Sequence, residues 1–572
     1  MESESWAKKL QLKNKIWLII PALHWGLTFI YEKLILKWDD NSWDIFWSKS
    51  LDDSISNSMQ STILYVCGKL IAALLIYLLW KGVYSIVKHK IPPHIIAFFV
   101  FICVVSGVFL ALCWPWSFDW QDTYTLYAFA VRMIPWYWHH FLTSAFYVGC
   151  LMVIPFPFAI SVIQSLFFSA LITYIFYKLE KVVSLWLPLR FLVLAIFVAP
   201  TTFVLVTQGY RNCLYSILCM YYVAELCFGM LDKRKEEEAL KYPKIVRLMV
   251  IGAVLSVWRT EGILIGIVGT AITLICICKS SKRKRFFGIL VFVIAFVILS
   301  LPQKIGDKKY YNKDYIIMST IEGLQAVLNS SSVNLEYDGA ADDLAAINAY
   351  ASIDYIKQYG TAGKRGYFYE NGNMDFDQSC ADPEVQNGYL KAVVRLAMHN
   401  PVPYVKKQLN FTLGALGTKR RLDIDEYCGP ETNGNSAQYT MHEIGREDIY
   451  SHKVVSSWVG SSVYNGIGMQ AHVFWCLWNE RFEQKNFSLI VRILILLMNC
   501  LIALIEIVKK IRKKKGNFAF GMIAMTFMVQ FIIIAMTIPS SYSPYIYSVT
   551  FPSVILQFIY MANALMHRSA RY

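Results

Sequence analysis

Apolar stretches of about twenty residues recur along most of this chain, and they limit what it can fold into. A helix of that length crosses the hydrocarbon core of a bilayer, whereas a soluble domain cannot bury so many of them. Of the 572 residues, 56% are hydrophobic and 17% are charged, whereas about one-quarter is charged in an ordinary soluble protein. The sequence therefore predicts an all-α membrane protein that crosses the bilayer many times.

We predict about twelve membrane-spanning helices, several of them near the lower length limit for a crossing. These helices cover residues 16–36, 61–80, 94–114, 157–178, 186–206, 212–231, 244–258, 262–278, 286–302, 487–508, 517–538 and 546–566. The polar segment 303–485 is long enough for a small mixed α/β domain, with helices expected from Ala340 to Tyr359 and from Gln386 to Asn400. The expected divisions are N-terminal helices (1–90), a transmembrane module (91–302), an extracytoplasmic domain (303–485) and C-terminal helices (486–572).

Lysine and arginine residues gather in the short loops on one side of the predicted bundle, and this sets its orientation. Twelve crossings with both termini in the cytoplasm place these clusters there, including the runs at 233–244, 279–285 and 509–515. The loop 37–60 on the opposite side carries five aspartates against two lysines. The net charge of +15 thus reflects topology and makes nucleic acid a poor partner. With a residue usage typical of an AT-rich bacterium, we expect a multi-pass protein of a bacterial cell membrane.

Residues 139–154 are apolar enough for one more helix, but we do not expect them to cross the membrane. A crossing there would move the basic run near Lys233 to the outside, against the positive-inside rule. Pro135, Pro155 and Pro157 bracket the stretch, and proline tends to end helices. We therefore predict an outer loop, 118–155, whose helices lie along the membrane surface.

A few charged residues stand at the ends of apolar helices, all on the predicted non-cytoplasmic side. They are Asp119, Asp122, Arg211, Arg259 and Glu261. Charges this close to the hydrocarbon are costly, and each is therefore a hypothesis for a functional site. Carboxylates and cations at one membrane face are typical of a site for an anionic, membrane-borne substrate.

Each of these residues also has a plainer structural interpretation. Asp122 is placed to accept a proton from an incoming hydroxyl, whereas Asp119 fits a loop position or a helix N-cap equally well. Arg211 is on the wrong side for an idle cation, although an arginine at an interface also extends to water. Arg259 can hold a phosphate in its planar fork with Glu261 as its anchor, or the two can form a simple ion pair.

His139 and His140 follow in the same outer loop. They are candidates for binding a phosphate or a sugar hydroxyl, and a structural role beside the neighbouring aromatic residues is the alternative. Adjacent histidines rarely chelate one metal, and the sequence has no ligand cluster that demands a metal. The chain has 13 cysteines, and Cys380 and Cys428 are two of those in the polar segment 303–485. A disulfide between them requires an oxidising compartment, and both states stay open.

In their order along the chain, four local patterns resemble the GT-C superfamily of polytopic glycosyltransferases, especially bacterial cell-surface members that act on polyprenyl-linked sugars. The resemblance covers about residues 90–565, and the patterns are Asp122-Thr leading to His139-His140, Ser161-Val-Ile-Gln164, Arg211-Asn212, and Arg259-Thr-Glu261-Gly262. Three departures stand out. The chain has His-His where many relatives have His-Pro, Arg-Asn where they have Lys-Asp, and no Arg beside the tyrosines of the last outer rim, 540–547.

This resemblance implies a glycosyltransferase with a bundle of about twelve helices. Its donor would be a sugar on a polyprenyl phosphate or diphosphate, and its acceptor a glycan or lipid of the cell envelope. Asp122 would be the general base, and Arg211, Arg259 and His139 would stabilise the leaving phosphate. Some relatives use a divalent cation such as Mg or Mn, and its use here stays open. The rival interpretations are a polysaccharide polymerase or ligase of another fold, a lipid-linked sugar flippase, and a non-catalytic envelope-assembly protein.

Overall fold

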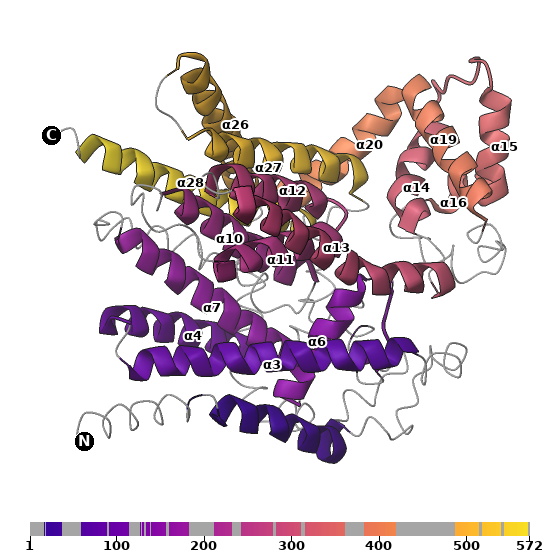
Figure 1. Ribbon diagram of the computed structural model, residues 1–572. Coiled ribbons are helices and arrows are strands. Elements are labelled where there is room, and N and C mark those ends of the chain that lie inside the picture. Colours follow the sequence, from indigo (N-terminus) through magenta and orange to yellow (C-terminus); the bar gives the residue numbers. More distant parts are fainter. Residues whose placement is uncertain are drawn as a thin grey trace, which may run out of the picture.

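The computed structural model is almost entirely helical, with no strand among the residues that it describes (Figure 1). Those residues are 17, 19–36, 59–88, 91–113, 126, 129–130, 133–137, 139–155, 159–181, 211–231, 242–277, 282–310, 315–360, 382–418, 487–513, 517–538 and 543–569. Asp119, Asp122, Cys380 and Cys428 lie outside them.

Within this described part of the chain, seven helices are long and apolar enough to cross a membrane. They are α3 (Met59–Val87), α7 (Ala159–Glu180), α10 (Arg211–Leu231), α13 (Lys282–Tyr310), α26 (Phe487–Ile511), α27 (Phe518–Thr537) and α28 (Tyr547–Ser569). The prediction of an all-α membrane protein is confirmed in this form. The predicted count of twelve crossings is not confirmed.

The remaining predicted spans fall on other helices or outside the described residues. The predicted spans 94–114, 244–258 and 262–278 coincide with helices, and 16–36 overlaps a helix that ends in a π-helical turn. The helices are α4 (Pro93–Cys113), α11 (Tyr242–Trp258), α12 (Gly262–Ile272) with η4 (Thr273–Ile277), and the turn η1 (Glu32–Leu36). The predicted span 186–206 lies outside the described residues.

Two contacts show how the helix ends pair. At one end of the bundle, His94 at the start of α4 lies 3.0 Å from the carboxylate of Glu180 at the end of α7. At the other end, the turn that joins α11 to α12 places Arg259 over the ring of Tyr215, in the first turns of α10. We call this second end, which holds the α11–α12 turn and the start of α10, the site end.

Helix α6 (Phe141–Val153) is enclosed by protein. Most of its side chains are buried, and it packs across α3, where two glycines permit a close approach. A methyl group on Gly149 would lie 2.6 Å from Ile71 Cγ2 and 3.1 Å from the carbonyl oxygen of Gly68. The helix is short and ends before Pro155, as predicted. The expectation that it lies along the membrane surface is wrong, because other helices cover it.

A small helical domain follows α13 and lies beside the bundle in Figure 1. Its helices are α14 (Tyr315–Leu328), α15 (Ala340–Tyr350), α16 (Ile353–Tyr359), α19 (Pro383–His399) and α20 (Pro401–Leu413), followed by the π-helical turn η6 (Gly414–Thr418). It has its own core, and the buried carboxylate of Asp343 forms an ion pair with Arg395 at 2.5 Å and accepts a hydrogen bond from Tyr337 at 2.9 Å. The two predicted helical stretches are confirmed, whereas the described residues of this domain show no strand.

Helix α26 carries three buried polar residues at intervals of seven, so that all three lie on one face. Arg492 donates to the carbonyl oxygen of Ala415 at 2.6 Å, and Asn499 donates to Ser553 of α28 at 2.7 Å. Glu506 accepts from Tyr560 of α28 at 2.8 Å. The opposite face of α26 exposes apolar side chains, namely Leu494, Leu497, Leu501 and Leu504. The polar face is therefore turned into the protein and the apolar face toward lipid.

We expect Gly149→Ala to lower the thermal stability of the detergent-solubilised protein. The added methyl group meets Ile71 and the backbone of Gly68, and overpacking of this kind costs about 1–3 kcal/mol. Gly107→Ala in α4 is the matched control, because no atom lies within 4 Å of the added methyl group there. Equal melting temperatures for the two variants, measured by fluorescence-detected gel filtration after heating, would contradict the close crossing of α6 and α3.

Candidate functional site

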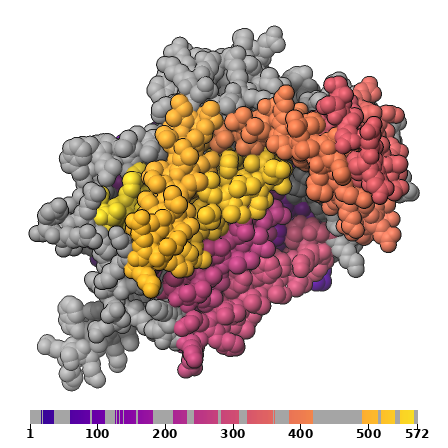
Figure 2. Space-filling model, turned by 90° about the horizontal axis from the view of Figure 1, so that it is seen from above, coloured from indigo at the N-terminus to yellow at the C-terminus, as the bar shows by residue number. Residues whose placement is uncertain are grey.

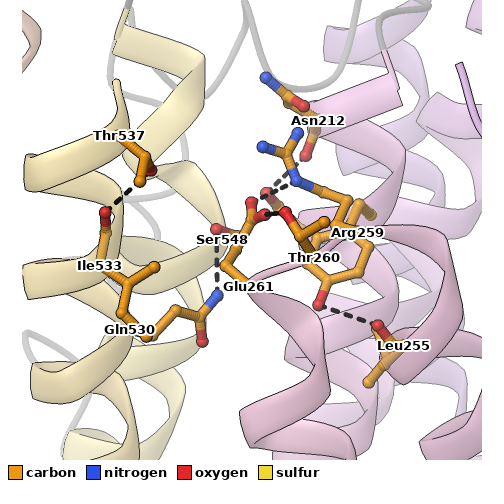
Figure 3. Close-up of polar contacts among 11 residues, drawn as sticks. Asn212, Leu255, Arg259, Thr260, Glu261, Gln530, Ile533, Thr537 and Ser548 are labelled. Atoms are coloured by element: carbon orange, nitrogen blue, oxygen red, sulfur yellow. Dashed lines mark hydrogen bonds and ion pairs between the residues drawn. The ribbon is translucent and has the colours of Figure 1, made fainter. Parts of the chain in front are cut away.

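The tight turn between α11 and α12 forms the centre of the candidate site (Figure 3). Helix α11 ends at Trp258 and α12 begins at Gly262, whose amide donates to the carbonyl oxygen of Arg259 at 3.0 Å. A side chain at position 262 would collide with the carbonyl oxygen of Leu255 and the hydroxyl of Tyr215. Glycine is therefore required for the chain to turn back here with α10 packed against it.

Arg259 and Glu261 form a buried ion pair within this turn, as Figure 3 shows. The Thr260 hydroxyl donates to the second oxygen of Glu261 at 3.3 Å, and the guanidinium group lies 5.8 Å from the ring centre of Tyr215. A carboxylate beside an arginine fixes the direction of its planar fork, which can bind a phosphate through two parallel hydrogen bonds. The arrangement that the sequence suggested, an arginine anchored by its neighbour, is present.

The first residues of α10, Arg211 and Asn212, lie at the same end of the bundle. Asn212 is only 1% exposed, yet its side-chain nitrogen and oxygen make no hydrogen bond to the described residues. Figure 3 shows it beside Arg259. A buried polar group without a partner costs about 1–3 kcal/mol, so this amide is suited to a bound water or ligand.

His140 joins this group from the start of α6. Its Nδ1 accepts a hydrogen bond from the amide of Leu142 at 3.2 Å and so caps the helix. Burial, and second the positive charge of Arg211, lower the pKa of His140 to about 4. The ring is therefore neutral near pH 7 with its proton on Nε2, because Nδ1 is the acceptor. A neutral donor close to a guanidinium group suits an anionic or hydroxylated ligand.

His139 is placed differently from its neighbour. It is 1% exposed, and its ring centre lies 4.5 Å from that of Trp136. Nearby, Trp258 of α11 donates to Thr143 of α6 at 2.8 Å and ties α6 to the α11–α12 turn. The geometry thus favours the packing interpretation for His139 and leaves His140 at the site.

The structure also shows charged residues that the sequence interpretation did not use. Arg492 is buried and lies 5.9 Å from the ring centre of Tyr547, so the last tyrosine rim does have an arginine beside it, from another helix. The sequence feature that could have revealed Arg492 is a cation at the sixth position of a long, largely apolar helix. Ion pairs also lie away from the site end, namely Lys69–Glu32, Arg247–Glu225 and Lys509–Glu506. The charges are thus less confined to one face than we expected.

The structure brings together four of the seven predicted site residues: His140, Arg211, Arg259 and Glu261. His139 is enclosed next to them, and Asp119 and Asp122 lie outside the described residues. Among the described residues, no group of three or more His, Cys, Asp or Glu side chains could hold a metal ion. The described part of the site therefore consists of two arginines, a neutral histidine and a buried glutamate that pairs with one of the arginines.

Separate removal of Arg259 or Glu261 is expected to destabilise the protein more than removal of both. Glu261→Gln leaves a buried guanidinium group without its counter-charge, and breaking such a pair costs about 3–5 kcal/mol. The double variant Arg259→Gln/Glu261→Gln removes both charges and should recover part of that loss. Thermal unfolding of the four forms in one detergent measures the coupling, and strictly additive losses would show that the two side chains do not act as a pair.

Acidification should destabilise the protein through His140. Because its pKa is about 4 in the folded protein, against an ordinary value of 6.5, the folded state binds this proton more weakly than the unfolded state does. The contribution is fully present above pH 6.5 and is lost as the pH falls toward 4. His140→Asn keeps a good helix cap without this titration, so its melting temperature should fall less over that range. Parallel melting curves would contradict the lowered pKa.

Comparison with known proteins leaves the site to be interpreted from its own geometry. No protein-family model, no curated protein and no solved structure matches the chain. The chemistry of the α11–α12 turn and the start of α10 is therefore the ground on which a function can be argued.

Proposed function

We propose that this protein is an integral-membrane glycosyltransferase that moves a sugar from a polyprenyl-phosphate-linked donor to a glycan or lipid acceptor of the cell envelope. One observation carries the proposal: the site end holds Arg211 close enough to the neutral His140 to act on its pKa, and it holds Arg259 over the ring of Tyr215, in the same first turns of α10 as the unpartnered amide of Asn212. These groups suit a phosphate whose lipid tail lies in the bilayer.

In the proposed reaction the acceptor hydroxyl attacks the anomeric carbon of the donor sugar. The bond from that carbon to the phosphate oxygen breaks, a new glycosidic bond forms with inversion, and the hydroxyl proton passes to a carboxylate. By its resemblance, Asp122 is the proposed base, with Asp119 as its alternative. The negative charge that develops on the leaving phosphate is stabilised by the guanidinium groups, which are already oriented before reaction.

Glu261 has a supporting role in this scheme. Its carboxylate is occupied by Arg259 and by the hydroxyl of Thr260, and it therefore positions a cation and is a poor candidate for the base. The Gly262 turn holds this pair at the end of two helices, where a phosphate at the membrane surface can reach it. The proposal places this end of the bundle outside the cytoplasm, in agreement with the basic loops at 233–244 and 279–285.

A second candidate function is the movement of lipid-linked sugars across the membrane. It is favoured by the buried carboxylates that pair with cations away from the site end, because transporters place charged groups near mid-membrane. The pairs Lys69–Glu32 and Arg247–Glu225 are the clearest examples. In each, however, the two charges neutralise one another, which is also what a structural contact between helices requires.

The test is transfer of radiolabelled sugar from synthetic polyprenyl-phosphate donors by the full-length protein in liposomes. We expect turnover by the wild type, its loss in Asp122→Asn, and a fall of about 10²-fold in kcat for Arg211→Gln, since one interaction with the developing charge is removed. Arg512→Gln is the matched control, because this exposed arginine lies directly after α26, far along the chain from the site. It should leave the rate unchanged.

Other outcomes discriminate between the candidates. An unchanged rate in Asp122→Asn but a lost one in Asp119→Asn would assign the base to Asp119. Absence of turnover with every donor, together with protein-dependent movement of the labelled lipid between leaflets, would overturn the transferase in favour of the transporter. A protein that neither transfers sugar nor moves the labelled lipid, and that keeps its cellular role after Asp122→Asn, Asp119→Asn and Arg211→Gln, would be a non-catalytic assembly protein.

A further inference from the structure

Helix α20 carries an apolar face that no other described part of the chain covers. Val402, Val405 and Leu409 recur at helical spacing and are 74%, 47% and 52% exposed. The opposite face, with Gln408, Phe411 and Thr412, is buried. The helix is thus amphipathic in an unusual sense, because its apolar side is the one turned away from the protein.

Helix α20 ends against the bundle, where its buried face contacts α27. The hydroxyl of Thr412, near the end of α20, donates to the carbonyl oxygen of Ala535 in α27 at 3.2 Å. The neighbouring residues of α27, Ile532 and Met536, are exposed apolar side chains. Figure 2 shows α20, in orange, as a bridge from the gold helices of the bundle to the small domain. An apolar stripe at this place meets the membrane where the bundle emerges from it.

The charges on α20 fit a surface of lipid headgroups. Lys406 is exposed between Val405 and Leu409. Lys407 is turned the other way and is 3.3 Å from Glu322 of α14, which fixes the rotation of α20 against the small domain. Apolar residues with an interspersed lysine are the pattern of a helix that lies in the interface of an anionic membrane.

We propose that the exposed face of α20 rests in the headgroup region of the bilayer, with Val402, Val405 and Leu409 inserted toward the acyl chains and Lys406 against anionic headgroups. This lipid contact holds the small helical domain at a fixed height beside the site end of the bundle. The inference is independent of the proposed glycosyl transfer, because it rests on the surface of α20 alone.

The test uses the full-length protein, one copy per nanodisc of phosphatidylethanolamine and phosphatidylglycerol. An environment-sensitive fluorescent amino acid replaces Val405, and in a matched control it replaces Asp342, which is exposed at the start of α15. We expect blue-shifted emission at position 405 and strong quenching by lipids brominated in their acyl chains. At position 342 we expect water-like emission and no quenching.

Lys406→Glu supplies an independent measurement on the protein labelled at position 405. Quenching should weaken in nanodiscs that contain phosphatidylglycerol and stay unchanged in nanodiscs of phosphatidylcholine alone. Water-like emission at position 405 would overturn the proposal, since the face would then be solvated. Blue-shifted emission without bromolipid quenching would also overturn it, because protein would then be covering the face.

Discussion

A charged or hydrogen-bonding group at hydrocarbon depth must find its partner inside the protein, and the rest of this structure depends on that requirement. On α26, Asn499 is hydrogen-bonded to Ser553 and Glu506 is hydrogen-bonded to Tyr560, so both polar groups have partners in α28. Lys69 meets the requirement with Glu32 from the first helix, and Arg247 meets it with Glu225. Each contact joins two helices, so the groups that are costly in lipid also specify which helices lie together.

Asn212, at the site end, departs from this rule. Arg259 has Glu261, but the side chain of Asn212 makes no hydrogen bond to the described residues, although it is buried beside the same turn. Single buried side-chain oxygens without a hydrogen bond also occur elsewhere in the described residues, at Gln60 and Gln530 for example, whereas Asn212 lacks a hydrogen bond at both of its polar atoms. An amide in that state suits a binding site, because such a site keeps polar groups available for its ligand. Close packing around Gly262 preserves the arrangement, since the turn has no room to relax.

The sequence predicted the helices well where a long apolar run decides the matter. Residues 212–231 and 517–538 became α10 and α27 almost residue for residue, and the helices at 340–359 and 386–400 also formed. It predicted the pairing of Arg259 with Glu261, because the two residues share one short turn. The burial of α6 by other helices was not predictable from the sequence. It depends on the close approach of Gly149 in α6 to Gly68 in α3, and these residues are some eighty positions apart along the chain. Arg492 was missed for the same reason: its partners, Ala415 and Tyr547, come from distant segments.

The polar contacts of Asn499 and Glu506 on α26 have a mechanical consequence. These contacts stand two turns apart, so a slide or rotation of α26 past α28 would break the bonds at Asn499 and Glu506 together, in a medium that offers no water to replace them. The two helices must therefore move as one body. Any separation of helices in this bundle has to occur along another interface, where apolar surfaces can part without leaving a polar group unpaired.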